Sequence, residues 1–171
     1  MVSFDKTGVN HREVILAVLS DVSGRRLALN DIVQTEEHPR PEIPVLDFDV
    51  NWTHSGDVCV LAYADKGVNV GVDFEMHKPN RMRIAERFYS AEEVSHLKDL
   101  DENRAVTEFF RLWCRKEALF KCAGGTFFEG AVRRSVLETP LVLEQSRIVH
   151  LCDVDEPVGE AKASLCVAVC K

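Results

Sequence analysis

The feature that most constrains the fold is a long amphipathic segment from Asp101 to Cys122, which has the 3.6-residue period of a helix. It ends before Gly124 and the glycine that follows, a pair that favours helix termination. Segments on both sides alternate apolar and polar residues instead, as half-buried strands do. The combination predicts an α+β fold. The apolar stripe of the expected helix consists of Val106, Phe109, Phe110, Trp113 and Phe120.

Shorter patterns predict the other elements. HREVILAVLS is expected to be a short helix, because Asn10 can cap its start and Gly24 follows its end. Ser90 and Glu93 form a capping box that opens another helix through Leu97. Alternation predicts strands, the first three joined as a meander, over 47–54, 59–64, 68–75, 135–143, 146–154 and 162–170.

The order of these elements predicts two related halves. Each half supplies helical surface and antiparallel strands, as a pseudo-duplicated α+β fold would. The expected boundary lies after Glu75, in the segment MHKPN. This gives an N-terminal module over 1–76 and a C-terminal module over 77–171.

Composition limits the classes of function. The chain has 171 residues, of which 46% are hydrophobic. Because its net charge is −7, we do not expect a uniformly basic nucleic-acid binder or a binder of anionic membranes. No apolar run approaches the roughly 20 residues of a membrane helix, and the start lacks the layout of a signal peptide. The six cysteines have no C-x-x-C spacing and lie mostly in apolar runs, which is typical of core thiols in a reducing compartment. We therefore expect a soluble, cytoplasmic protein.

Two carboxylates share one face of the expected strand from Val68 to Glu75. Asp73 and Glu75 alternate with apolar residues, and Gly71 on the same face allows a close approach to the backbone. A bound cation would hold both charges. The alternative is a solvated strand end, and a D-x-E pattern alone does not decide between them.

A third carboxylate lies in the long helical segment. Glu117 follows Trp113 by four residues, so it projects from the apolar stripe and needs a partner. Lys121 would be an ordinary i,i+4 partner. The other possibility is that Glu117 joins Asp73 and Glu75 as an oxygen ligand, and three carboxylates favour Mg²⁺ over zinc.

Basic and hydroxyl side chains near these carboxylates suggest a phosphate-rich ligand. Taken singly, each has an ordinary interpretation as a solvated charge or a turn residue. Lys116 and Lys121 would flank such a ligand at the metal, and the further candidate donors are Arg40, Thr53, His54 and Ser55.

Four segments stand out as motifs, and they are THSG at 53–56, GVDFE at 71–75, RFYSAEE at 87–93 and WCRKEALFK at 113–121. Together they resemble the motifs of the 4′-phosphopantetheinyl transferase superfamily. Each motif is loose by itself, but the four occur in the family's order and separations over most of the chain. The chain resembles the two-module type that activates peptide synthetases, such as surfactin synthetase, more than the short trimeric type.

This resemblance implies an activity and its partners. The enzyme would transfer the 4′-phosphopantetheine arm of coenzyme A to a serine of an apo acyl or peptidyl carrier protein and release adenosine 3′,5′-bisphosphate. Mg²⁺, with Mn²⁺ as the alternative, would lie with coenzyme A between the two modules of a monomeric pseudo-dimer. A catalytically degenerate homologue that binds coenzyme A or carrier proteins without turnover is the alternative. A structural assembly protein is a third hypothesis.

The resemblance also implies roles for individual residues. Asp73, Glu75 and Glu117 match the metal ligands, and Glu117, Lys121 and Glu75 match the catalytic groups. The nucleotide and its phosphates would be met by Arg12, Arg40, Thr53, His54, Ser55, Lys116 and Lys121.

The general base is expected to be a carboxylate that takes the serine proton. Glu117 is the first choice, because apolar surroundings raise a carboxyl pKa while a metal and Lys121 lower it. Glu75 is the alternative.

The chain departs from the family pattern in three places. Pro39 precedes Arg40 where a glycine is usual, and proline lacks an N–H that could bind phosphate. Thr53 replaces a serine, and an N-terminal strand and helix are expected to be missing.

A cluster of arginines in the helical middle of the chain could dock an acidic carrier protein. Its members are Arg81, Arg83, Arg87, Arg104, Arg111 and Arg115.

Overall fold

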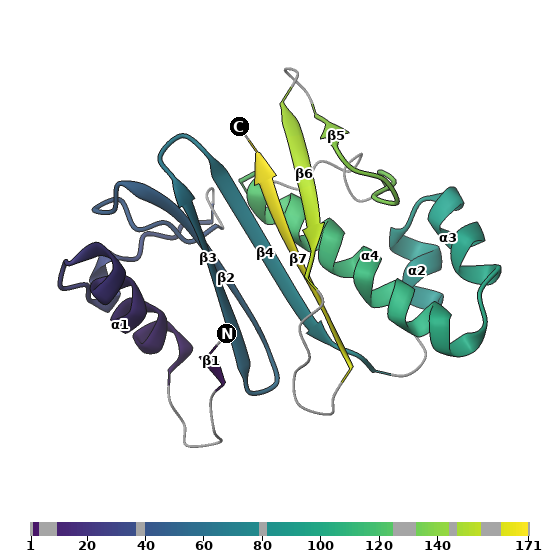
Figure 1. The fold of residues 1–171 in the computed structure, drawn as a ribbon, viewed down its shortest axis with the longest axis horizontal. Helices are drawn as coiled ribbons and strands as arrows, with labels where there is room; N and C mark the ends of the chain where they lie inside the picture. Colours follow the sequence, from purple (N-terminus) through teal and green to yellow (C-terminus); the bar gives the residue numbers. More distant parts are fainter. Residues whose placement is uncertain are drawn as a thin grey trace.

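The computed structural model describes residues 2–3, 10–36, 40–78, 82–124, 133–143, 147–154 and 162–170. Two antiparallel sheets lie side by side, with a helix packed on each (Figure 1). Helix α1 lies at one end of the molecule, and α2 and α3 lie at the other. The predicted α+β class with antiparallel strands is confirmed.

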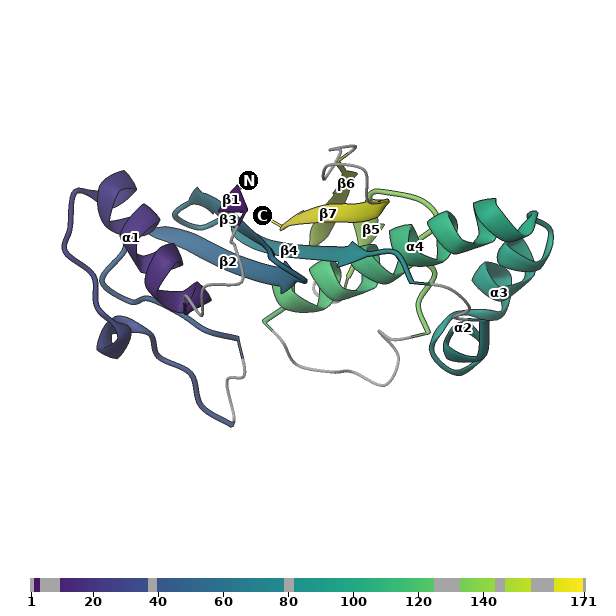
Figure 2. The same cartoon turned by 90° about the horizontal axis from the view of Figure 1, so that it is seen from below.

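The N-terminal sheet has the strand order β1-β3-β2. Helix α1 begins where the Asn10 side chain accepts a hydrogen bond from the Arg12 N–H, and it ends at Gly24, whose φ is 65°. Its apolar face packs on the outer face of this sheet, against Val50 and Cys59 (Figure 2). The elements of this half are β1 (Val2–Ser3), α1 (His11–Ser23), η1 (Leu29–Asp31), β2 (Phe48–Ser55) and β3 (Val58–Asp65).

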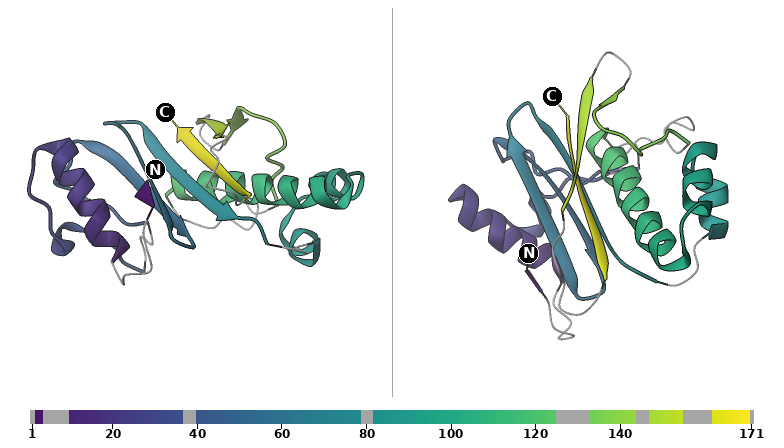
Figure 3. Two further views of the ribbon diagram at one scale, coloured as in Figure 1. Left: turned by 60° about the horizontal axis from the view of Figure 1, so that its bottom comes forward. Right: turned by 45° about the vertical axis from the view of Figure 1, so that its right-hand side comes forward.

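The C-terminal sheet has the order β4-β7-β6-β5. Helix α4 runs along one face of β4 and β7, as the views in Figure 3 show. The capping box predicted at Ser90 and Glu93 is present, and the Asp101 side chain caps α4. The elements of this half are β4 (Asn69–Met76), α2 (Met82–Phe88), α3 (Ala91–Lys98), α4 (Glu102–Cys122), β5 (Leu141–Val142), β6 (Ile148–Asp153) and β7 (Ala163–Cys170).

Two strand predictions were wrong in detail. The three-stranded meander is a two-stranded hairpin of β2 and β3, because β4 pairs along its whole length with β7. The strand expected over 135–143 is reduced to β5, since Pro140 has no N–H for a ladder. The cysteine prediction holds for five residues, which are buried, but Cys152 is exposed, and all six thiols are free.

The two sheets are joined by side chains of β2 that reach the open edge of β4. The backbone N–H of Val70 donates to Asp49 Oδ2 at 2.7 Å, and the N–H of Val72 donates to Asn51 Oδ1 at 2.9 Å. The sequence pattern of β2 indicated a strand with only one buried face. Both faces are covered instead, and Asn51 is only 3% exposed. The polar residues of β2 therefore replace a backbone ladder between the sheets.

An apolar contact accompanies this polar junction. Val58 and Val60 of β3 pack against Val72 and Phe74 of β4 and Leu165 of β7. The valines and Phe74 thus point toward the N-terminal sheet, and the residues that alternate with them point toward α4. This alternation positions the acidic side chains of β4 beside the helix.

Gly71 sets the distance between β4 and α4. A Cβ atom at this position would lie 2.1 Å from the carbonyl oxygen of Ala118 and 2.5 Å from the backbone nitrogen of Cys122. The close approach predicted from Gly71 is therefore made by the backbone of the helix. Only glycine permits this packing.

We expect Gly71→Ala to lower the free energy of unfolding by about 3 kcal/mol or more, because the new methyl group meets helix backbone that cannot move aside. Urea unfolding measures this loss. Gly67→Ala is the control. Apart from its two chain neighbours, no atom of the described residues lies within 4 Å of its added Cβ, and only its φ of 87° carries strain, which costs about 1–2 kcal/mol. Equal stabilities of the two variants would contradict the proposed close contact.

Asn51→Ala should lower the free energy of unfolding by about 2 kcal/mol, because the buried N–H of Val72 loses its acceptor. Asn103→Ala, on the exposed surface of α4, is the control and should change stability by less than about 0.5 kcal/mol. Chemical denaturation of both variants gives the comparison. An Asn51 variant as stable as the control would show that the side chain does not join the sheets.

Candidate active site

Asp73 is the most buried acidic side chain where β2, β4 and α4 meet. The residue is 5% exposed, and its Oδ1 accepts hydrogen bonds from Thr53 Oγ1 at 3.1 Å and from Lys121 Nζ at 2.6 Å. Lys121 also donates to the carbonyl oxygen of Val72. Among the described atoms, Asp73 Oδ2 is buried and has no hydrogen-bond partner. One oxygen of the carboxylate is thus held by two donors, while the other has no hydrogen-bond partner among the described atoms.

Glu75 lies on the same face of β4 and is partly exposed. Its Oε2 accepts a hydrogen bond from Ser55 Oγ at 3.0 Å. Ser55 in turn accepts one from the backbone N–H of Met76 at 3.2 Å. Both β4 carboxylates are therefore hydrogen-bonded to hydroxyls of β2.

Glu117 extends from α4 toward these two carboxylates. Burial raises the pKa of Glu117, and the negative charges of Asp73 and Glu75 raise it further, while Lys121 opposes them. Within the described residues, Lys121 forms its ion pair with Asp73 rather than with Glu117. The charges of Asp73 and Glu75 thus oppose the charge of Glu117 across the junction of strand and helix, although the sequence separates Glu117 from the other two by more than forty positions.

The chemistry of these donors fits a divalent cation. The described residues contain no group of three or more His, Cys, Asp or Glu side chains that is arranged to hold a metal ion. Among the residues that the structure describes, the buried Oδ2 of Asp73 nevertheless lacks the hydrogen-bond donor that such an atom requires. Its repulsion of Glu117 would be relieved by a cation between them. Asp73, Glu75 and Glu117 would be the ligands.

The nearest thiol does not compete for this chemistry. Burial and the charge of Asp73 raise the pKa of Cys114 far above its ordinary value, and its sulfur lies 3.2 Å from the carbonyl oxygen of Ser164. The Cys114 thiol is therefore neutral. Because only a thiolate is a strong nucleophile, Cys114 acts as a core residue and not as a reactive group.

Lys116 lies apart from the contacts just described. Its ammonium pairs with Glu93 of α3 at 2.8 Å and donates to the carbonyl oxygen of Arg134. Burial lowers the pKa of Lys116, and Glu93 counteracts this. Glu93 is fully buried and also accepts hydrogen bonds from the N–H groups of Ser90 and Val136. Lys116 therefore anchors α4 to α3, a role that the sequence did not indicate.

Arg40 bridges the two sheets. Its Nη2 bonds to Asp49 at 2.7 Å and to the carbonyl oxygens of Val50 and Val70 at 3.1 and 2.8 Å. Its Nε is buried without a partner among the described atoms. Pro39, which was expected to disturb phosphate binding, lies outside the described residues.

The THSG segment is divided between two faces of β2. Thr53 and Ser55 point to the carboxylates, whereas His54 is exposed and its ring lies 4.7 Å from that of His11, centroid to centroid. Arg12, the residue after His11 in α1, is exposed, and its Nη2 donates a hydrogen bond to Gln34 Oε1. His54 and Arg12 thus lie near the start of α1, on the outer side of the sheet.

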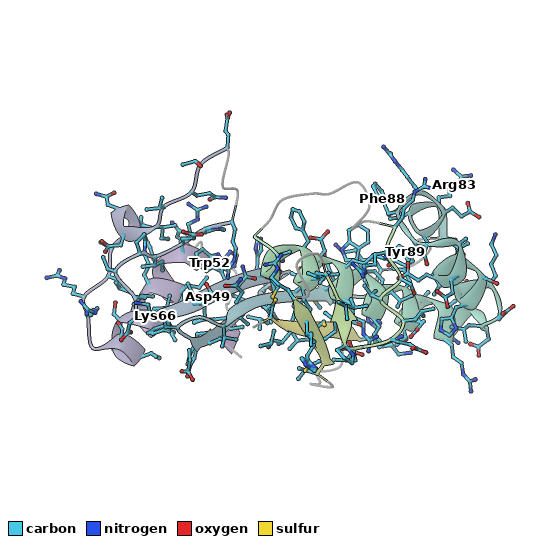
Figure 4. All side chains as sticks on the ribbon, turned by 90° about the horizontal axis from the view of Figure 1, so that it is seen from above. Asp49, Trp52, Lys66, Arg83, Phe88 and Tyr89 are labelled. Carbon is cyan, nitrogen blue, oxygen red and sulfur yellow. The ribbon has the colours of Figure 1, made fainter. Side chains whose placement is uncertain are left out.

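The arginines of the helical middle differ in exposure. Arg115 is 8% exposed and bonds through Nε and Nη2 to Asp153, and Arg111 pairs with Glu108 and Asp153. Arg83 is exposed on α2, near Phe88 and Tyr89, at the end of the molecule opposite to Asp49 and Trp52 (Figure 4). The pairing of Arg111 and Arg115 with Asp153 was not predicted, because Asp153 is distant from both in the sequence.

A family model supports an assignment for this fold and arrangement of carboxylates. The model of the 4′-phosphopantetheinyl transferase superfamily, ACPS, matches residues 69–161. This region includes the D-x-E strand and all of α4. Among the described residues, no helix is long and apolar enough to cross a membrane.

Relatives with assigned activities are also similar. The 4′-phosphopantetheinyl transferase psf-1 of Bacillus pumilus is 40% identical over 94 residues, which cover 54% of this chain and 40% of that protein. Sfp of Bacillus subtilis strain 168 is 36% identical over 91 residues, covering 53% and 40%. The transferase AcpT of Escherichia coli K12 is 30% identical over 142 residues, covering 82% and 72%. The matches thus span about 40% of the length of the Bacillus relatives and more of AcpT.

The similarities and the α+β fold with two antiparallel sheets point to a single protein family. The chain belongs to the 4′-phosphopantetheinyl transferase superfamily. The resemblance inferred from the four sequence motifs is therefore confirmed.

In metal-free protein, we expect Glu117→Gln to raise the melting temperature at neutral pH. The folded-state pKa of Glu117 is raised, so the carboxyl group stabilises the fold when it is protonated. This contribution to the free energy of unfolding is complete below the ordinary glutamate pKa, and it is lost as the pH rises through the folded-state pKa. The gain from glutamine should therefore shrink as the pH falls. Calorimetry in chelator from acidic to neutral pH measures this difference. The exposed variant Glu42→Gln is the control, and a gain that does not depend on pH would contradict the expected repulsion.

Proposed function

We propose that this protein transfers the 4′-phosphopantetheine arm of coenzyme A to a serine hydroxyl of an acyl or peptidyl carrier protein, in a reaction that requires Mg²⁺. The single observation that carries the proposal is the approach of Asp73, Glu75 and Glu117 from β4 and α4, with Asp73 Oδ2 buried and without a hydrogen-bond partner in the described part of the chain. Membership of the superfamily supports the same reaction. The other product would be adenosine 3′,5′-bisphosphate.

The reaction places defined demands on the protein. The serine oxygen forms a bond to the β-phosphorus of coenzyme A, and the bond from that phosphorus to the nucleotide's phosphate oxygen breaks. No covalent enzyme intermediate is needed, so positioning and charge neutralisation supply most of the rate. When bound, Mg²⁺ would neutralise the pyrophosphate and orient its oxygens. Asp73, Glu75 and Glu117 would hold it.

Lys121 would add a positive charge at the same place. Its ammonium lies 2.6 Å from Asp73 Oδ1, and the side chain is 24% exposed. A lysine so placed can donate to a phosphate oxygen while it remains close to Asp73. We propose that Lys121 stabilises the charge that develops on the leaving phosphate.

Glu117 is the proposed general base. Burial and the charges of Asp73 and Glu75 favour uptake of a proton by Glu117, whereas Lys121 opposes it and a bound cation would oppose it as well. The proton leaves the serine oxygen as the new phosphorus–oxygen bond forms and moves to Glu117, directly or through water. Glu75 is the second candidate because it is also partly exposed.

The nucleotide would lie on the outer side of β2. His54 and Arg12 are exposed there, close to the start of α1. We propose that they contact the 3′-phosphate of coenzyme A. Arg40 would contribute positive charge from within the sheet junction. Two carbonyl oxygens that bond to its Nη2 hold the side chain there. Lys116 would support α4 through Glu93.

The carrier protein would dock near α2. Arg83 and Arg87 are exposed on this helix, whereas Arg104, Arg111 and Arg115 pair with carboxylates. Arg81 lies outside the described residues. Exposed positive charge favours an acidic partner.

We further propose that the protein is a monomer of two related modules, each a helix packed on an antiparallel sheet, and that it acts in the cytoplasm.

Incubation with coenzyme A, Mg²⁺ and a panel of apo carrier proteins should add the mass of the arm to at least one carrier, as measured by intact-protein mass spectrometry. Glu117→Ala should lower the rate about 100-fold or more, as expected for loss of a general base. Asp73→Ala and Glu75→Ala should abolish transfer, and Glu42→Ala is the exposed control. If all carriers stay unmodified while a known transferase modifies them, the proposed activity is wrong. Binding of coenzyme A without transfer would identify a non-catalytic homologue.

A further inference from the structure

We propose that Thr53 and Ser55 are positioning residues, whose hydroxyls orient Asp73 and Glu75 toward a divalent cation instead of contacting the nucleotide. The inference rests on the proposed function, because the cation is the one that the transfer would need. It differs from the role implied by the sequence motif, in which Thr53 and Ser55 accompany His54 at a phosphate.

The hydrogen-bond directions at Ser55 support this role. A serine hydroxyl has one proton to donate. Ser55 Oγ accepts from the Met76 N–H, which leaves that proton for Glu75 Oε2 at 3.0 Å. Glu75 is thereby held through one oxygen, and its Oε1 is the oxygen that can turn to a ligand.

Thr53 creates the same asymmetry at Asp73. An ionised carboxylate only accepts hydrogen bonds, so the threonine hydroxyl is the donor to Asp73 Oδ1. Lys121 donates to the same oxygen. Two donors on Oδ1 fix the plane of the carboxylate, and Oδ2 has no hydrogen-bond partner within the described ranges. Oriented in this way, the carboxylate presents a single oxygen to a cation.

The hydroxyls of Thr53 and Ser55 lie on the side of β2 that faces the carboxylates of β4. Thr53 is 8% exposed and Ser55 is 7% exposed, whereas His54 between them is exposed on the opposite face. Alternation along β2 forces this division, because successive side chains of a strand point to opposite sides. Within the segment, His54 is therefore suited to a phosphate, and its two neighbours are suited to the carboxylates.

The spacing of the two strands makes the orientation rigid. Thr53 bonds to Asp73 and Ser55 bonds to Glu75, so each bond spans twenty positions. On the same side of β2, Asn51 and Ser55 accept hydrogen bonds from the backbone N–H groups of Val72 and Met76 in β4. The hydroxyls are thus fixed to the strand that carries the carboxylates. Groups that orient metal ligands in this manner commonly change metal affinity 10- to 100-fold when they are removed.

The test is Mn²⁺ binding to the full chain in the presence of coenzyme A, followed by the loss of the electron paramagnetic resonance signal of free Mn²⁺. Thr53→Val and Ser55→Ala should each weaken binding by about tenfold or more. Thr53→Ser keeps the hydroxyl and should restore the wild-type affinity. Thr107→Val, on the exposed surface of α4, is the matched control and should bind as the wild type does.

Melting curves of the metal-free variants separate positioning from general destabilisation, since binding is measured only where each variant is folded. Ser55→Ala introduces a smaller side chain and decides the matter if Thr53→Val does not fold. Wild-type Mn²⁺ affinity in Thr53→Val and Ser55→Ala would overturn the positioning role. So would a Thr53→Ser variant that binds as weakly as Thr53→Val.

The outcomes also separate this inference from the proposed reaction. Carrier modification by the wild type, together with unchanged Mn²⁺ affinity in the variants, would reject the positioning role and leave the transferase activity in place. Weakened Mn²⁺ binding in a protein that modifies no carrier would support the positioning role and reject the activity. A wild-type protein that binds no Mn²⁺ with coenzyme A present would overturn the positioning role.

Discussion

The structure depends on the polar junction between β2 and β4. In most sheets, neighbouring strands satisfy each other's backbone groups through a ladder. Here the side chains of Asp49, Asn51 and Ser55 accept hydrogen bonds from the open edge of β4. Because an unpaired buried N–H is costly, this edge is stable only while the N-terminal sheet remains docked. The two halves therefore form one folded unit.

The same junction determines the electrostatics of the acidic cluster. Asp73 and Glu75 lie on the face of β4 that meets α4, and Gly71 allows the helix backbone to approach closely enough for Glu117 to interact with both. Only Lys121 among their described contacts brings positive charge to Asp73. The cluster is thus left with excess negative charge in a partly buried place, which is the condition that favours a hard cation.

Much of the local structure could be predicted from the sequence, because local rules decide it. The Asn10 and Ser90 caps, the extent of α4 and the shared face of Asp73 and Glu75 follow from spacing alone. The partner of β4 could not be predicted, since alternation identifies a strand but not its neighbour. For the same reason, the burial of Asn51 and the pairing of Arg115 with Asp153 were missed. Both depend on residues brought together from distant parts of the chain.

The buried pair of Lys116 and Glu93 fixes the rotation of α4 about its own axis. Successive side chains of a helix are separated by roughly 100° around that axis, and Lys116 directly precedes Glu117. Glu93 is held from three sides, by Ser90, Val136 and Lys116. A turn of α4 that moved Glu117 away from β4 would break this pair in the core. The direction of the Glu117 side chain is therefore also set by the contact between Lys116 and Glu93, roughly a quarter turn away around the helix.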